Sequence, residues 1–65
     1  MADWIKTLSD GRRVKFGHDQ VAEITFLTAQ LEGNEVVYSV MLAKPEIPLS
    51  REEVERRFEH ELAKT

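Results

Sequence analysis

Few side chains in this chain could carry out covalent chemistry. There is no cysteine, which excludes thiolate nucleophiles and thiolate metal ligands. Catalysis by serine needs a nearby base and a group that orients the base. No serine has such neighbours in the sequence, because Ser9 lies in a predicted turn, Ser39 within a predicted strand and Ser50 at a predicted helix start. The sequence therefore predicts that the protein is not an enzyme and has no catalytic residues.

His18 and Asp19, with Glu23 beyond them, form the one group that could bind a cation or act as an acid–base pair. Adjacent residues of these types are commoner in ordinary turns, because aspartate bonds to its own backbone there. A zinc site also needs about three or four clustered ligands. His60 lies between two glutamates on the predicted helix, where we expect it to be solvated. We therefore predict neither a metal site nor a cofactor.

A basic segment, formed by Arg12, Arg13 and Lys15, could contact the phosphates of a nucleic acid, and nearby aromatic rings could stack on its bases. However, the net charge of the chain is −3, and the basic segment is too small for affinity driven by phosphate contacts. Charged residues that alternate with apolar ones are also typical of edge strands, where charge prevents aggregation. A small nucleic-acid-binding regulator is therefore the second of two functional hypotheses.

Turn signals divide the chain into the elements that must position these residues. Runs rich in β-branched and aromatic residues predict strands at about 4–8, 12–16, 21–31 and 35–42, with a turn at 17–20 and a helix at about 51–63. The expected fold is α+β: a four-stranded antiparallel meander of two hairpins, with one C-terminal helix packed on one face of the sheet. A chain of 65 residues has room for a single domain, which we place at 1–65.

The first hairpin is predicted to turn at residues 9–11, which end in a glycine that accepts positive φ. A two-residue loop would set Lys6 opposite Lys15, and like charges in that position are unfavourable. A three-residue loop instead pairs Trp4 with Phe16, and this is the register that we expect. The alternative for residues 4–8 is a short helix, which would have little more than one turn and a costly nucleus.

The helix has the clearest local signal in the chain. Ser50 is followed three residues later by Glu53, which predicts a capping box. Two prolines prevent a regular structure in the preceding connection. The apolar positions of the helix form a narrow stripe: Val54, Phe58 and Leu62. Such a stripe suits a helix that lies on a sheet and has its opposite face in water.

Two registers remain open for the second hairpin. A two-residue loop at 33–34 pairs Leu27 with Val40, and it leaves these side chains on the face that the helix does not cover: Ile24, Phe26, Val37 and Met41. A three-residue loop pairs Phe26 with Val40, and it leaves a different set there: Leu27, Leu31, Val37 and Met41. A shift of one residue therefore exchanges the two faces of the sheet.

Both registers leave apolar side chains on the face opposite the helix. Isolated surface hydrophobes are normal, and a β-bulge could instead curl the sheet closed. A contiguous apolar patch, however, marks an interaction site. We therefore predict a small non-enzymatic protein–protein interaction module, whose partner is either another protein or a second copy of the chain. In the three-residue register, its partner-binding residues are Ile5, Leu27, Val37 and Met41.

The expected location of the protein is the cytoplasm. The first residues lack the apolar stretch of a signal peptide. No run approaches the roughly 18 apolar residues of a membrane span, so a membrane is not an expected partner.

Overall fold

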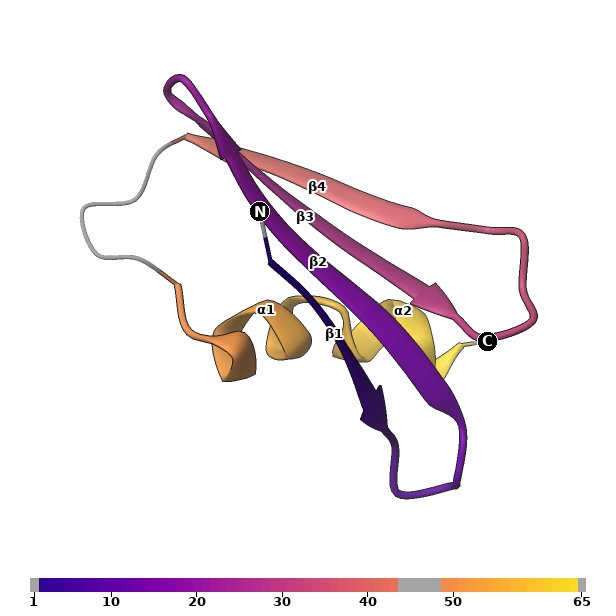
Figure 1. Cartoon of the computed structure of the whole chain (residues 1–65). Coiled ribbons are helices and arrows are strands. Elements are labelled where there is room, and N and C mark those ends of the chain that lie inside the picture. The colour runs from indigo at the N-terminus through magenta and orange to yellow at the C-terminus, as the bar shows by residue number, and fades with distance from the viewer. Residues whose placement is uncertain (1, 44–48, 65) are drawn as a thin grey trace.

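The computed structural model of the chain describes residues 2–43 and 49–64. They form four strands and two helices: β1 (Ala2–Thr7), β2 (Arg13–Val21), β3 (Ile24–Leu31), β4 (Tyr38–Ala43), α1 (Arg51–Arg57) and α2 (Glu59–Ala63). The strands make one antiparallel sheet in the order β1-β2-β3-β4, and both helices lie against the same face of it (Figure 1). The predicted α+β fold with a four-stranded antiparallel meander is confirmed.

The core lies between the sheet and the helices. Its buried apolar side chains are Val14, Phe16, Leu27, Ala29, Leu31, Val54, Phe58 and Leu62. The ring of Phe16 is central, since its centroid lies 5.7 Å from that of Trp4 and 6.4 Å from that of Phe58. Ring pairs in such arrangements add to the free energy gained by burying the rings. The apolar stripe of the C-terminal segment therefore faces the sheet, as predicted.

The first hairpin has the predicted register. Trp4 lies opposite Phe16, and the Leu8 N–H donates to the Arg12 carbonyl at 2.7 Å to close the loop. Gly11 has a φ of +89°, a conformation that residues with side chains rarely adopt. The three-residue loop therefore sets the rings of β1 and β2 together on the side of the helices.

The turn predicted at 17–20 is wrong. β2 continues through this segment, and Gly17 pairs with Thr28 of β3. The chain turns instead at Ala22 and Glu23, where Ala22 has a φ of +54°. Such a conformation costs a residue with a side chain on the order of 1 kcal/mol, so glycine or asparagine usually occupies it. Alanine stands there in this chain, and the local sequence therefore does not mark the turn. Gly17 has a packing role, because a Cβ at this position would collide with the Thr28 Oγ1.

The second hairpin pairs Leu27 with Val40. This is the register of the two-residue loop, although the connection between the strands is longer and spans residues 32–37. Asn34 holds part of this connection out of the ladder, because its Oδ1 accepts from the Val36 N–H at 2.9 Å. β4 therefore begins later than predicted.

The three-residue register is wrong, and so is the placement of Leu27 on the uncovered face. Leu27 lies on the helix side of β3 and is fully buried. Successive residues of a strand point to opposite faces, so an error of one residue reverses every assignment along it. The apolar residues that β3 presents on the uncovered face are Ile24 and Phe26.

The single helix predicted at 51–63 is divided at Phe58. Its start is as predicted, with the Glu53 N–H donating to the Ser50 Oγ at 3.2 Å. Phe58 has a φ of −106° and a ψ of 2°, and its N–H donates to the Glu55 carbonyl at 3.1 Å. This bond spans three residues and is of the tighter 3₁₀ type. α1 therefore ends and α2 begins at a residue that stays buried in the core.

Candidate functional site

The face of the sheet that α1 and α2 leave uncovered, called the open face below, carries the candidate site. Opposite residues of antiparallel strands share a face, so the side chains of the open face form rows across the sheet. A polar row crosses its middle and consists of Asp3, Gly17, Thr28 and Ser39. This polar row separates two ends of the open face that differ in chemistry.

One end of the open face is apolar and adjoins the turn between β2 and β3. Val21 lies opposite Ile24, and Phe26 lies opposite Met41. The exposed fractions of Val21, Ile24 and Met41 are 56%, 42% and 69%. Side chains in directly opposite positions contact one another. These four residues therefore form one continuous surface, called the hairpin-end patch.

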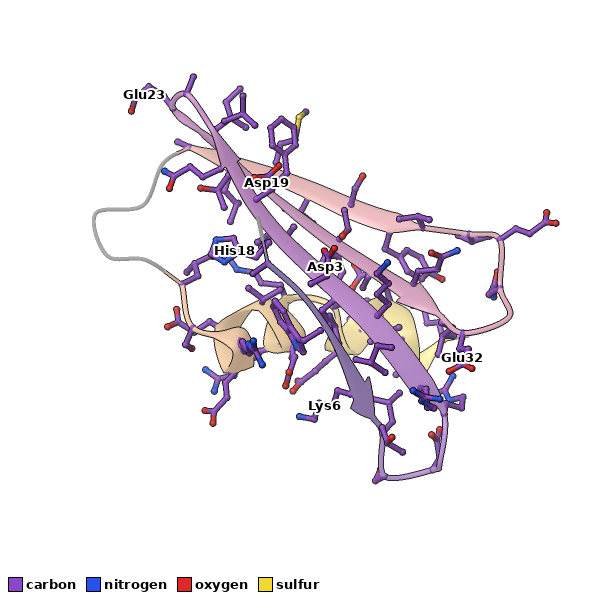
Figure 2. All side chains as sticks on the ribbon, in the orientation of Figure 1. Asp3, Lys6, His18, Asp19, Glu23 and Glu32 are labelled. Carbon is purple, nitrogen blue, oxygen red and sulfur yellow. The ribbon has the colours of Figure 1, made fainter. Side chains whose placement is uncertain are left out.

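Acidic side chains border the hairpin-end patch. Asp19 lies opposite Phe26 in the ladder, and Glu23 lies in the turn. Figure 2 shows Asp3, Asp19 and Glu23 along this half of the sheet. The described residues of this end, 19–26 and 41–43, include no lysine or arginine. The described border of the hairpin-end patch is therefore negatively charged.

A shallow hollow lies beside the hairpin-end patch. It measures about 210 Å³ and is lined by Asp3, Gly17, His18, Asp19, Phe26 and Thr28. Gly17 has no side chain that could fill the hollow. Pockets for drug-sized ligands measure at least about 300 Å³, so this hollow suits a single protein side chain better than a small molecule.

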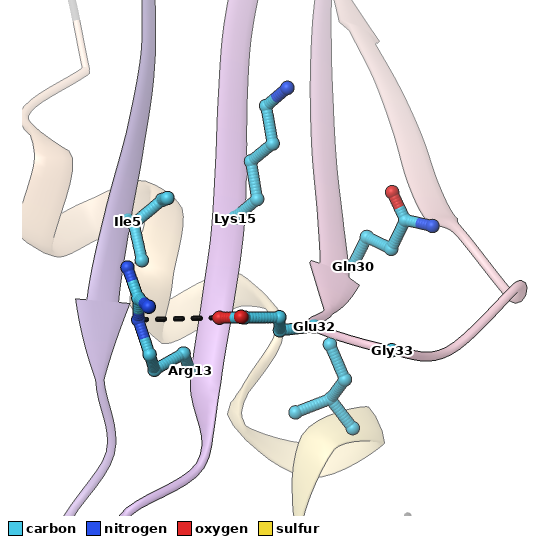
Figure 3. A pocket seen from close by; sticks show the side chains of 7 residues that line it. Ile5, Arg13, Lys15, Gln30, Glu32 and Gly33 are labelled. Carbon is cyan, nitrogen blue, oxygen red and sulfur yellow. Dashed lines mark ion pairs between the residues drawn. The ribbon is translucent and has the colours of Figure 1, made fainter.

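The opposite end of the open face is polar and partly basic. A hollow of about 270 Å³ there is lined by Ile5, Arg13, Lys15, Gln30, Leu31, Glu32 and Gly33 (Figure 3). The Arg13 Nε lies 3.3 Å from the Glu32 Oε2, and both side chains are more than half exposed. Solvent screens an ion pair of this kind, so it adds little to stability.

The structure brings one of the predicted partner-binding residues, Met41, into the hairpin-end patch. Ile5 is exposed beyond the polar row, and Val37 is exposed in the 32–37 connection. Leu27 is buried on the other face. The remaining patch residues are absent from that prediction: Val21, Ile24 and Phe26. The sequence did contain a signal for Ile24 and Phe26, because the register of the two-residue loop places both of them on the uncovered face.

The basic segment is not gathered on one surface. Arg12 turns toward α2, since its Nη2 donates to the Leu62 carbonyl at 3.3 Å. The Arg12 Nε also lies 2.6 Å from the Asp10 Oδ2. Arg13 and Lys15 lie on the open face instead. The three predicted nucleic-acid contacts are thus divided between two sides of the sheet.

His18 and Asp19 lie on opposite faces of β2, because neighbouring residues of a strand alternate. Their side chains therefore point to different sides of β2, although both residues line the hollow beside the hairpin-end patch. Among residues 2–43 and 49–64, no group of three or more histidine, aspartate and glutamate side chains is placed to hold a metal ion. His60 is exposed on α2, as expected.

A polar cluster connects β1 to α1 on the helix side of the sheet. Glu55 accepts from the Trp4 Nε1 at 2.8 Å and from the Lys6 Nζ at 2.7 Å. The Arg51 guanidinium lies 5.2 Å from the centroid of the Trp4 ring, within the range of a cation–π contact. Burial by itself would raise the pKa of Glu55. The hydrogen bonds from Lys6 and Trp4 and the charge of Lys6 outweigh burial and hold that pKa below its ordinary value of 4.5.

Replacing Glu55 by glutamine is expected to lower the free energy of unfolding near pH 7 by about 1 kcal/mol. A carboxylate whose pKa falls on folding stabilises the protein above its unfolded pKa, and this contribution disappears as the pH falls through the folded pKa. The wild type should therefore lose stability between about pH 5 and pH 3, and Glu55→Gln should lose less. Urea denaturation followed by circular dichroism at several pH values measures both effects.

The matched control for this variant is Glu59→Gln, which removes the same charge from an exposed position on α2. Its free energy of unfolding should change by less than about 0.5 kcal/mol. Equal effects of the two substitutions would show that the bonds made by Glu55 do not stabilise the fold.

No family model, no curated protein and no solved structure matches this chain. A fold class by itself does not assign a function. In the part of the chain that the structure describes, neither helix is both long and apolar enough to pass through a membrane.

Proposed function

We propose that this protein is a small non-enzymatic module that binds another protein through the hairpin-end patch. The observation that carries the proposal is that four neighbouring apolar side chains lie on a sheet face that no described element covers. Isolated apolar residues on a surface are normal. These residues are instead paired across three strands, and a contiguous apolar surface is typical of an interaction site.

The acidic border indicates the chemistry of the expected partner. Asp3 and Glu23 favour a protein that presents apolar side chains surrounded by lysine or arginine, because complementary charges speed encounter and exclude wrong partners. The hollow beside Gly17 offers room for one side chain of the partner. Met41 can adapt to the shape of the partner, since its side chain is unbranched and polarisable.

The basic segment supports a protein, rather than a nucleic acid, as the partner. Arg12 and Arg13 each face an acidic side chain, and they lie on different sides of the sheet. Binding driven by phosphates needs several basic groups on one surface. The expected setting is the cytoplasm, where proteins rarely depend on disulfides and where a chain without cysteine would need none.

Affinity capture from an extract of cells that make the protein tests the proposal with two matched variants. Ile24→Asp places a charge within the hairpin-end patch. Ile5→Asp places the same charge on the same face beyond the polar row, at a residue that is 55% exposed compared with 42% for Ile24. Neither residue belongs to the buried core, so circular dichroism should show that both variants are folded.

A specific protein is expected to be retained equally by the wild type and by Ile5→Asp, and at least about tenfold less by Ile24→Asp. The reason is that an apolar contact would bury the new carboxylate without a partner. The proposal fails if no protein is enriched over a column without bait. It also fails if Ile24→Asp retains the same proteins in the same amounts as the wild type.

A further inference from the structure

β4 forms one outer edge of the sheet, and the direction of its backbone groups follows from the ladder. The Glu32 N–H donates to the Arg13 carbonyl at 2.9 Å, so these residues form a hydrogen-bonded pair that continues the β2–β3 ladder by one position. Bonded and non-bonded pairs alternate along antiparallel strands. Leu27 therefore directs its N–H and C=O toward β4, where they meet those of Val40. Met41, the next residue, directs its N–H and C=O away from the sheet.

The two edges of the sheet differ in how they are protected. β1 carries Asp3 and Lys6, and Lys6 is bonded to Glu55 of α1. The segment 36–43, which contains β4, has neither a charged residue nor a proline. Natural sheets usually protect an edge with such residues, because its free N–H and C=O groups otherwise pair with another strand. The β4 edge is therefore suited to accept a further strand.

We propose that the β4 edge pairs with the β4 edge of a second copy of this chain. The backbone groups of Ser39, Met41 and Ala43 point outward, so an antiparallel pairing must set these residues opposite one another. When Val40 lies on the two-fold axis, Ser39 of one copy meets Met41 of the other, and residues 38–42 of β4 are paired in both copies. No charged residue of either copy lies in this segment, so no like charges meet.

A second copy fits the β4 edge because the same uncharged segment serves as template and as added strand. Two-fold pairing uses one surface twice and closes after two copies. The outer edges of the joined sheet are then both β1, whose charged residues oppose further addition. The axis is perpendicular to the sheet, so both hairpin-end patches stay exposed on the same side. This self-association therefore goes beyond the proposed function and does not depend on it.

Two proline variants test the β4 edge. Met41→Pro removes an outward N–H from β4, and Ile5→Pro removes an outward N–H from β1 by the same alternation. Neither N–H bonds within the sheet of one copy, and proline is tolerated at such edge positions. In sedimentation velocity, the wild type and Ile5→Pro should be dimers, whereas Met41→Pro should need at least about tenfold more protein to dimerise.

A single cysteine provides a second test that keeps every backbone group in place. The chain has no cysteine of its own. Val40 would face its own copy in a non-bonded pair, with Cα atoms about 4.5 Å apart, which is within the range of a disulfide. Val40→Cys should therefore form a covalent dimer under mild oxidation, whereas Ile5→Cys should remain monomeric on a non-reducing gel.

A wild type that sediments as a monomer up to roughly 1 mM overturns the edge pairing, and so does a Val40→Cys variant that links no faster than Ile5→Cys. Ile24→Asp should dimerise like the wild type, because Ile24 lies on β3 and not on the edge. A monomeric wild type that still captures its partner rejects the edge pairing alone. A dimer that captures nothing rejects the proposed function alone.

Discussion

Replacing Phe58 by alanine is expected to lower the free energy of unfolding by about 3–5 kcal/mol. Phe58 is 1% exposed, and its ring meets that of Phe16 within the core. It also lies where α1 and α2 join, so the cavity would undermine both helices. A native domain is stable by only about 5–15 kcal/mol. The variant should therefore unfold at much lower urea concentrations than the wild type.

Tryptophan fluorescence during urea unfolding measures this loss, because Trp4 is the single tryptophan and its ring stacks on Phe16 at 5.7 Å. Phe26→Ala is the matched control, since it removes the same atoms from a partly buried position on the open face. It should cost less than about 2 kcal/mol, in proportion to the smaller area buried. Equal losses from both variants would contradict the position of the core on the helix side.

Gly17→Ala is expected to lower the free energy of unfolding by about 1–3 kcal/mol, the cost of forcing a methyl group against the Thr28 side chain. A Cβ at this position would collide with the Thr28 Oγ1 and would lie 3.1 Å from the Asp3 Oδ1. Both neighbours belong to strands paired with β2. The clash can therefore be relieved only by moving side chains of the polar row.

Thr28→Ala identifies the origin of this cost, because it removes the oxygen that meets the new methyl group. The double variant Gly17→Ala/Thr28→Ala should be more stable than the sum of the single effects predicts, by about 1 kcal/mol. Urea denaturation of the four proteins gives this coupling energy. Strict additivity would mean that the clash with Thr28 is not the cause.

Local signals account for the parts of the fold that were predicted correctly. The loop at 9–11 determines the first hairpin, and Ser50 with Glu53 determines the start of the helix. The wrong predictions concern segments whose structure depends on contacts with residues far away in the sequence. Gly17 lies within β2, where it pairs with Thr28 of β3, and the helix is divided at Phe58, whose ring packs against Phe16 of β2. Neither contact can be seen in a stretch of neighbouring residues.

The sequence predicts the type of the candidate site, an uncovered apolar face, but only some of the residues that form it. An uncovered apolar face follows from the number of apolar residues on both sides of the strands. The residues that belong to this face depend on the register of β3 and β4, because a shift of one residue exchanges the two faces of the sheet. The long connection keeps Leu27 opposite Val40, and this places Leu27 in the core and Phe26 outside. Val21 was missed because it was expected to begin the third strand, whereas it is the last residue of β2 and lies opposite Ile24.

Mapping of amide chemical shifts, with the isotope-labelled chain titrated with the protein that it captures, tests most directly whether the hairpin-end patch binds a partner. We predict that the perturbed amides gather in residues 19–26 and 41–43, where the hairpin-end patch lies. Perturbations confined to α1 and α2, or to the hollow around Lys15, would contradict this assignment.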